Sequence, residues 1–211
     1  MNVDEAESRM QEIQRIMERA TLFTLLPGTP AVIGGLLVLV GCAVSYAMIG
    51  SLDFGDMLRI PFNQQAAFCV MWFAIGVIGI LLEVILTTRA AAKQQLVPAD
   101  RPMRVAAFSL TPSVVVAMVL TVKFLSSVMP KPEEIQYIVP VWMMLYGTGV
   151  YTAGLFSIRP PRILGLTFIA LGVFALLCFP QYGVVAAALS FGLLHIGFGI
   201  YIIRKQRQTV V

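Results

Sequence analysis

Five stretches of the chain contain no Asp, Glu, Lys or Arg, and this feature restricts the fold more than any other. They cover residues 20–52, 60–82, 105–122, 135–158 and 163–203. A helix needs about 20 apolar residues to cross the hydrocarbon layer of a membrane, so the last stretch is long enough for two crossings. Apolar residues make up 58% of the chain and charged residues only 12%, which is low for a soluble domain. Lipid is therefore the expected surroundings of this chain.

The last stretch divides at residues 179–183, because Pro180 removes a backbone donor and Gly183 favours a turn. The sequence therefore predicts an all-α polytopic membrane protein, a bundle of six transmembrane helices with an N-terminal cytoplasmic amphipathic helix. We expect the amphipathic helix and a turn in residues 1–30, the membrane domain in 31–203 and a basic cytoplasmic tail in 204–211. The predicted spans are 31–52, 66–88, 104–128, 135–157, 162–179 and 183–203.

The basic residues are distributed unevenly between the two sides of such a bundle. With six spans, both termini and the second and fourth connections share one side, which then carries 12 of the 15 Lys and Arg residues. The opposite side has only Arg59, Lys123 and Lys131. Because basic loops stay in the cytoplasm, the sequence predicts that both termini are cytoplasmic. Trp72 and Trp142 then fall near the outer ends of their spans, where an aromatic belt is expected.

The short connections between spans restrict the chemistry that the chain can perform. None is long enough for a domain outside the membrane, and the chain has no phosphate-binding loop, H-E-x-x-H or C-x-x-C motif. It has one histidine and three scattered cysteines, so we expect no metal and no cofactor. No nucleophile–base set and no basic soluble face can be recognised, so the sequence favours neither an enzyme nor a nucleic-acid-binding protein.

An amphipathic helix is predicted before the first span. Its apolar side is formed by residues that recur at three- and four-residue intervals, namely Met10, Ile13, Met17, Ala20 and Phe23. In one interpretation this face lies on the cytoplasmic lipid surface. In the other it docks onto a protein partner or a second copy of the chain, and the mixed charge of the opposite face keeps this interpretation open. Glu5 and Arg9 have the i,i+4 spacing of a stabilising ion pair.

The same segment carries a resemblance to a known family. Residues 13–23 read IQRIMERATLF and are followed by Leu26-Pro27-Gly28 and a glycine-rich first span. In this the chain resembles short bacterial polytopic membrane proteins that open with an I-M-E-[RK] helix, most clearly over residues 1–50. Pro27 departs from the Ser expected at that position. That family has no established activity, so the resemblance implies a bacterial cytoplasmic membrane location and nothing catalytic.

Two ionisable residues lie well inside predicted spans, where insertion of a charge is costly and a function is the default hypothesis. Glu83 precedes Arg89 by six residues and His195 precedes Ile203 by eight, so both are expected in the cytoplasmic half at a similar depth. Tyr151 falls in the same layer. These three side chains are candidates for a polar site that relays protons, binds a small cation or holds a lipid headgroup. Alternatively, Glu83 and His195 form packing hydrogen bonds between helices.

Glycines predict where helices approach one another. The pattern G-x-G-[VI]-Y occurs at residues 147–151 and again at 197–201. One interpretation is a duplicated helical hairpin, in which spans 3–4 are equivalent to spans 5–6; the other is coincidence in a glycine-rich chain. Pairs of small residues four positions apart also predict close packing, at Gly41/Ser45, Gly149/Ala153 and Ala188/Gly192.

Two functions are compatible with these patterns. The sequence favours a non-enzymatic accessory or regulatory membrane component that works through a protein partner, or as a homo-oligomer, by means of the N-terminal helix. The alternative is a small carrier or channel that uses an intramembrane polar site containing Glu83 and His195.

Overall fold

The computed structural model describes residues 5, 7, 9, 10, 13, 28–93, 101–126, 131–155 and 159–209, and the regular structure of this part is entirely helical. Six helices are long and apolar enough to cross a membrane. Many of their large apolar side chains point outward; Phe62 and Leu177, for example, are 84% and 74% exposed. Outward apolar faces of this extent suit lipid tails rather than water. The all-helical fold with six such helices is as predicted, and it supports a multi-pass membrane protein in general.

The six long helices follow the predicted order, with shifted ends. They are α2 (Gly28–Ile49), α3 (Phe62–Lys93), α4 (Arg101–Leu125), α6 (Ile138–Leu155), α7 (Arg159–Cys178) and a last helix in three parts. The last helix consists of α8 (Gly183–Ala187), a π-helical segment η2 (Ala188–Leu194) and α9 (His195–Thr209). The prediction of six helices with short connections is therefore confirmed.

The first and last long helices extend into the regions predicted to flank the membrane domain. In the region expected to hold a turn, residues 1–30, α2 begins at Gly28 and Pro30 occupies its first turn. A proline there loses no helical hydrogen bond, since the first amides of a helix have no partner in any case. The basic tail expected at residues 204–211 continues α9 as far as Thr209. Arg, Lys and Gln are good helix formers, and no Gly or Pro interrupts them.

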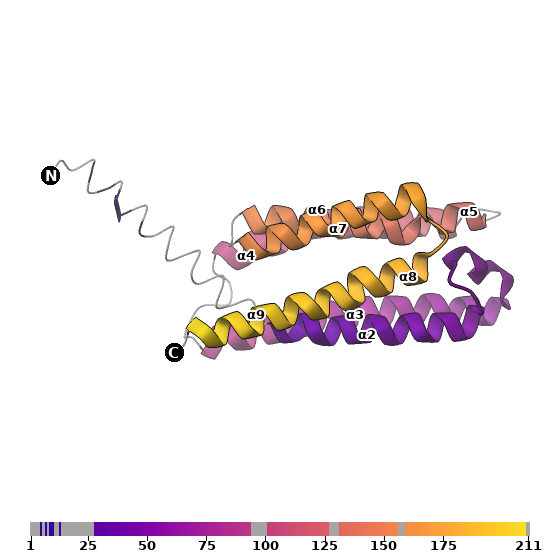
Figure 1. Ribbon diagram of the computed structural model, residues 1–211, viewed down its shortest axis with the longest axis horizontal. Helices are drawn as coiled ribbons and strands as arrows, with labels where there is room; N and C mark the ends of the chain where they lie inside the picture. Colours follow the sequence, from indigo (N-terminus) through magenta and orange to yellow (C-terminus); the bar gives the residue numbers. More distant parts are fainter. Residues whose placement is uncertain are drawn as a thin grey trace.

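The helices form two groups of three. We call α2, α3 and the last helix the α2 group, because α2 packs against α3, η2 and α9. We call α4, α6 and α7 the α6 group, because α6 packs against both α4 and α7. Figure 1 shows the two groups as separate layers that run side by side along the length of the molecule. The chain enters the α2 group, crosses to the α6 group for three helices, and returns to the α2 group with its last helix.

At one end of the bundle the two groups are joined by the connection between α2 and α3. This connection contains the 3₁₀ helix η1 (Phe54–Arg59), which packs against the short helix α5 (Pro132–Ile135) before α6. Phe54 and Met57 are buried, and Ile135 is completely so. The connection also contacts α8, where the Val184 amide donates to the Leu52 carbonyl at 3.2 Å. This η1 end, which lies opposite the C-terminus in Figure 1, holds much of the buried core.

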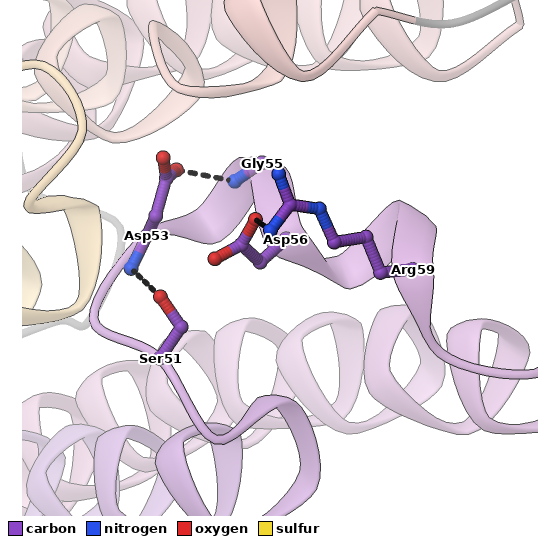
Figure 2. A network of polar contacts seen from close by, with 5 residues as sticks. All are labelled: Ser51, Asp53, Gly55, Asp56 and Arg59. Atoms are coloured by element: carbon purple, nitrogen blue, oxygen red, sulfur yellow. Dashed lines mark hydrogen bonds and ion pairs between the residues drawn. The ribbon is translucent and has the colours of Figure 1, made fainter.

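Polar contacts give η1 its shape (Figure 2). Asp53 precedes the helix, and its carboxylate accepts a hydrogen bond from the Gly55 amide at 2.7 Å. The Asp53 amide in turn donates to the Ser51 hydroxyl at 3.1 Å. Partial burial raises the pKa of the Asp53 carboxyl, and the bond from Gly55 opposes that rise. An Asp that accepts a hydrogen bond from an amide of the first turn stabilises the start of a helix. The η1 segment that packs over this end of the core therefore has a defined conformation.

Within each group, glycines bring helices into backbone contact. A Cβ on Gly35 of α2 would lie 2.6 Å from the Gly192 carbonyl oxygen of the last helix. A Cβ on Gly147 of α6 would lie 2.7 Å from the Gly165 carbonyl oxygen of α7. Approaches this close are possible only because the small residue has no side chain. The close packing that small residues predict is thus present, and it makes each group a compact unit.

The duplicated-hairpin hypothesis does not describe the packing. Spans 3 and 4 do form a packed pair, but span 6 packs against α2 of the other group. The two copies of the glycine pattern also have different surroundings, because Gly147 lies against α7 whereas a Cβ on Gly197 would meet no atom within 4 Å. The similarity of the two pentapeptides therefore does not reflect equivalent positions in the fold.

Trp72 and Trp142, which the sequence places near the same end of their spans, each make a hydrogen bond to a neighbouring helix. The Trp72 indole donates to the Ser45 hydroxyl at 3.0 Å, joining α3 to α2. The Trp142 indole donates to the Thr121 hydroxyl at 2.7 Å, joining α6 to α4. Each pairs within its own helix group, because an indole N–H in apolar surroundings is most stable with an acceptor. They are interhelical contacts instead of a lipid-facing aromatic belt.

Candidate functional site

A π-helical segment precedes the single histidine of the chain. In the segment Ala188–Leu194 the helix widens, and His195 is the first residue after it. The His195 Nδ1 atom lies 3.4 Å from the carbonyl oxygen of Ser190, five residues earlier. π-Helical turns are uncommon and are frequently found at functional sites, where they redirect a side chain. Here the segment directs the imidazole away from α2 and toward the α6 group.

The His195 imidazole crosses the boundary between the two groups. Its Nε2 atom lies 2.8 Å from the Tyr146 hydroxyl of α6, a hydrogen-bonding distance. We define the aromatic cluster as the four rings that meet at this point, which are Tyr146, Phe168, Phe191 and His195. Their centroids are separated by 5.0 Å for Tyr146–Phe168, 5.1 Å for Phe168–His195 and 5.4 Å for Tyr146–Phe191. The aromatic cluster thus links α6 and α7 of one group to η2 and α9 of the other.

Glu83 of α3 lies near this link. Glu83 is a titratable group of the same long-helix bundle, on the helix next to α2. Its carboxylate accepts a hydrogen bond from the Thr87 hydroxyl at 3.3 Å. The Glu83 side chain is exposed on the surface of α3. Of the three polar side chains, Tyr146 of α6 and His195 of α9 are joined by a hydrogen bond, whereas the hydrogen-bond partner of Glu83 is Thr87 on its own helix.

The phenol that contacts His195 is one that the sequence did not single out. Tyr151 was expected in the same layer as Glu83 and His195, but among the described contacts the phenol that reaches His195 is Tyr146. Tyr151 lies five residues further along α6, where its backbone packs against Gly165.

The predicted docking face is only partly within the described residues. Met10 and Ile13 are helical and 68% and 56% exposed, whereas Met17 and Phe23 lie outside the part that the structure describes. The predicted ion pair is present, with Arg9 and Glu5 joined at 2.9 Å.

The Tyr146–His195 pair can adapt to either charge state of the imidazole. A tyrosine hydroxyl donates one hydrogen bond and accepts others, and an imidazole nitrogen does either according to its tautomer. When His195 is neutral, the Tyr146 hydroxyl donates to Nε2; when His195 is charged, Nε2 donates to the hydroxyl. Among the described residues, no three His, Cys, Asp or Glu side chains lie close enough together to bind a metal ion.

Comparisons with protein-family models, with curated proteins and with solved structures find no match to this chain. What the site does must therefore be inferred from its geometry.

Removal of the Tyr146 hydroxyl tests the link between the groups. We expect Tyr146→Phe to lower the free energy of unfolding by about 1 kcal/mol, because interhelical hydrogen bonds in membranes contribute about that much and His195 loses its partner. The measurement is unfolding by sodium dodecyl sulfate in mixed micelles, followed by circular dichroism. Tyr182→Phe is the control, since Tyr182 is 46% exposed and lies outside the helices. Equal stability of the two variants would contradict the assigned hydrogen bond.

Proposed function

We propose that this chain is a secondary carrier for a small polar solute, and that transport is coupled to protonation of Glu83, Tyr146 and His195. The hydrogen bond between Tyr146 and His195 carries the proposal, because it joins the two helix groups through a group that can titrate. In many carriers the binding site lies near the middle of the membrane, between two units that rock against each other. This replaces Tyr151 by Tyr146 in the polar site that the sequence suggests.

The packing supports a movement of whole groups. Inside each group, helices touch at backbone level through glycines such as Gly35 and Gly147, so each group moves most easily as a unit. Between the groups, two sets of contacts stand out, one at the η1 end and the other at the aromatic cluster. A change at the aromatic cluster therefore acts on one of the principal joints between the groups.

Protonation supplies such a change. In the proposed cycle a proton is taken up at Glu83, the most exposed of the three side chains. Its transfer to His195 reverses the direction of the hydrogen bond with Tyr146. In apolar surroundings a charged imidazole is unfavourable unless neighbouring groups compensate its charge. Neutral and charged His195 therefore favour different distances between the α2 group and the α6 group. A ligand or proton shifts an equilibrium only through such a difference between states.

The orientation follows from the basic residues. We place both termini in the cytoplasm, and the membrane in question is the cytoplasmic membrane of a bacterium. The η1 end then faces outward and is the better packed end of the bundle. Solute and proton would reach Glu83 from the cytoplasmic side in this conformation.

A measurement that needs no knowledge of the solute tests the coupling. Proteoliposomes of the full chain are adsorbed on a solid-supported membrane and exposed to a step to lower pH. Proton entry into an intramembrane site moves charge within the membrane and gives a transient current. We expect this current for the wild type and its loss in Glu83→Gln, which cannot take up the proton.

Glu133→Gln is the matched control, because Glu133 is exposed and lies in the short helix α5, at the very end of its candidate span. It should leave the transient current unchanged. A wild-type current in Glu83→Gln, with equal amounts of reconstituted protein, would contradict proton coupling at this site. A current that is absent from the wild type as well would contradict the carrier proposal in its present form.

An accessory function is the second candidate, and the exposure of Met10 and Ile13 favours it. Two adjacent apolar side chains on a helix surface are suited to a groove on a protein partner or a second copy of the chain. We expect deletion of residues 1–26 to release a stoichiometric partner from gently purified protein, with the helical content of the bundle unchanged. Quantitative mass spectrometry of the co-purified proteins measures this. If the same proteins remain bound to Met10→Glu/Ile13→Glu, the docking function is wrong.

A further inference from the structure

A hollow on the surface of α9 is not used by the proposed carrier mechanism. It has a volume of about 460 Å³ and extends along most of α9, from Gly197 to Gln208. The described residues that line it are Gly197, Ile200, Tyr201, Arg204, Lys205 and Gln208. All six are exposed, and they recur at helical intervals along one side of α9. This part of α9 lies at the opposite end of the bundle from η1 (Figure 1).

The lining changes from apolar to cationic along the helix. Gly197 and Ile200 belong to the last charge-free stretch, and Arg204 is the first charged residue after it. Since charged side chains mark the surface of the hydrocarbon layer, one half of the hollow lies at acyl-chain level and the other at headgroup level. The Lys205 ammonium stands over the Tyr201 ring, 5.8 Å from its centre. Aromatic rings at this depth position neighbouring groups at the membrane interface.

We propose that this hollow binds one anionic phospholipid. Arg204 and Lys205 supply positive charge for the phosphate, and Arg offers two parallel donors to its oxygens. Gln208 also lines the hollow, and its amide adds a hydrogen-bond donor for the headgroup. A Cβ on Gly197 would meet no atom within 4 Å, so the absence of a side chain there leaves space for an acyl chain beside Ile200. A zwitterionic headgroup would bring its own cation next to two others and is therefore disfavoured.

The proposal does not depend on the carrier function. It concerns a different face of the last helix from the one that carries His195, since the aromatic cluster faces the α6 group whereas these residues are exposed. It also specifies more than a general attraction of basic residues to the membrane. Two cations, an aromatic ring and an open apolar wall are combined in one hollow.

Native mass spectrometry of the purified full chain tests the proposal. Delipidated protein is titrated with the anionic lipid palmitoyl-oleoyl-phosphatidylglycerol and, separately, with the corresponding phosphatidylcholine. We expect clear preference for the anionic lipid, and about thirtyfold weaker binding of it by Arg204→Gln/Lys205→Gln, because two interfacial cations are removed. Gly197→Leu should also weaken binding, because it fills the apolar half without a change in charge.

Arg207→Gln is the matched control, because Arg207 is exposed and basic on the same helix but does not line the hollow. It should bind the anionic lipid as the wild type does. Equal weakening by Arg207→Gln, or wild-type binding by Arg204→Gln/Lys205→Gln, would overturn the proposal in favour of non-specific attraction. Competition by inorganic phosphate at the concentration of the lipid would show that the hollow binds phosphate alone, and would also overturn it.

Discussion

Phe168→Ala is expected to lower the free energy of unfolding by about 2–3 kcal/mol and to loosen the joint between the two helix groups. Phe168 has no exposed surface, and its ring contacts those of Tyr146, Phe191 and His195. In a water-soluble protein this truncation costs about 3–5 kcal/mol. Lipid tails are as apolar as the helix interior, so the transfer contribution is small here and the cavity accounts for most of the expected loss.

The functional consequence of this change goes beyond stability. Phe168 holds the rings of Tyr146 and His195 from the side of α7, so its removal gives both rings space to move. A hydrogen bond weakens steeply when its angle departs from linearity. We therefore expect Phe168→Ala to reduce the transient current after a pH step, in addition to its effect on unfolding in mixed micelles.

Phe174→Ala provides the comparison. Phe174 is on the same helix but 56% exposed, and its ring contacts Phe179 rather than the aromatic cluster. We expect it to change the free energy of unfolding by less than about 1 kcal/mol, because the side chain already faces lipid. If both variants lose the same stability, the aromatic cluster is not a joint between the groups.

Gly35→Ala is expected to destabilise the bundle by about 1–3 kcal/mol, as additional atoms in a packed interface usually do. The new methyl group would lie 2.6 Å from the Gly192 carbonyl oxygen and 2.7 Å from a side-chain carbon of Ile196. Neither can retreat easily, since Gly192 belongs to the π-helical segment and Ile196 follows His195 directly. The new methyl group would therefore displace the backbone of residues 192–196, which positions the His195 imidazole.

The neighbouring glycine supplies a control of the same chemistry. A Cβ on Gly34 would meet no atom within 4 Å. Gly34→Ala is therefore expected to be neutral or to stabilise the helix slightly, because alanine loses less backbone entropy than glycine. The two variants differ by one position and should change the free energy of unfolding in opposite directions. Equal effects in mixed-micelle unfolding would mean that α2 and the last helix do not approach as closely as described.

The contrast between Gly34 and Gly35 shows what the sequence predicts about helix packing and what it does not. Patterns of small residues indicate that helices come close, and Gly192 does take part in such a contact, as predicted. They do not say which helices meet. Lipid surrounds every span alike, so the hydrophobic effect does not select a partner, and the selection rests on close packing between residues far apart in the chain.

The candidate site was also predictable only in part. Glu83 and His195 stand out in the sequence because a titratable group inside a membrane is costly and rare. Tyr146 does not stand out, since tyrosine is common at many depths, and a shift of five residues along a helix changes both its height and its direction. The π-helical segment that directs His195 toward Tyr146 has no recognisable signal in residues 188–194.

What the sequence alone determined is the number and order of the membrane-spanning helices. Each span needs an uninterrupted apolar run because no charged group is stable in hydrocarbon without a partner, and such runs are visible in a single sequence. The tertiary structure decided which spans form each group, and that Tyr146 of the fourth meets His195 of the sixth. These contacts depend on where backbones approach to within atomic distance, which a run of apolar residues leaves open because all its faces are equally acceptable to lipid.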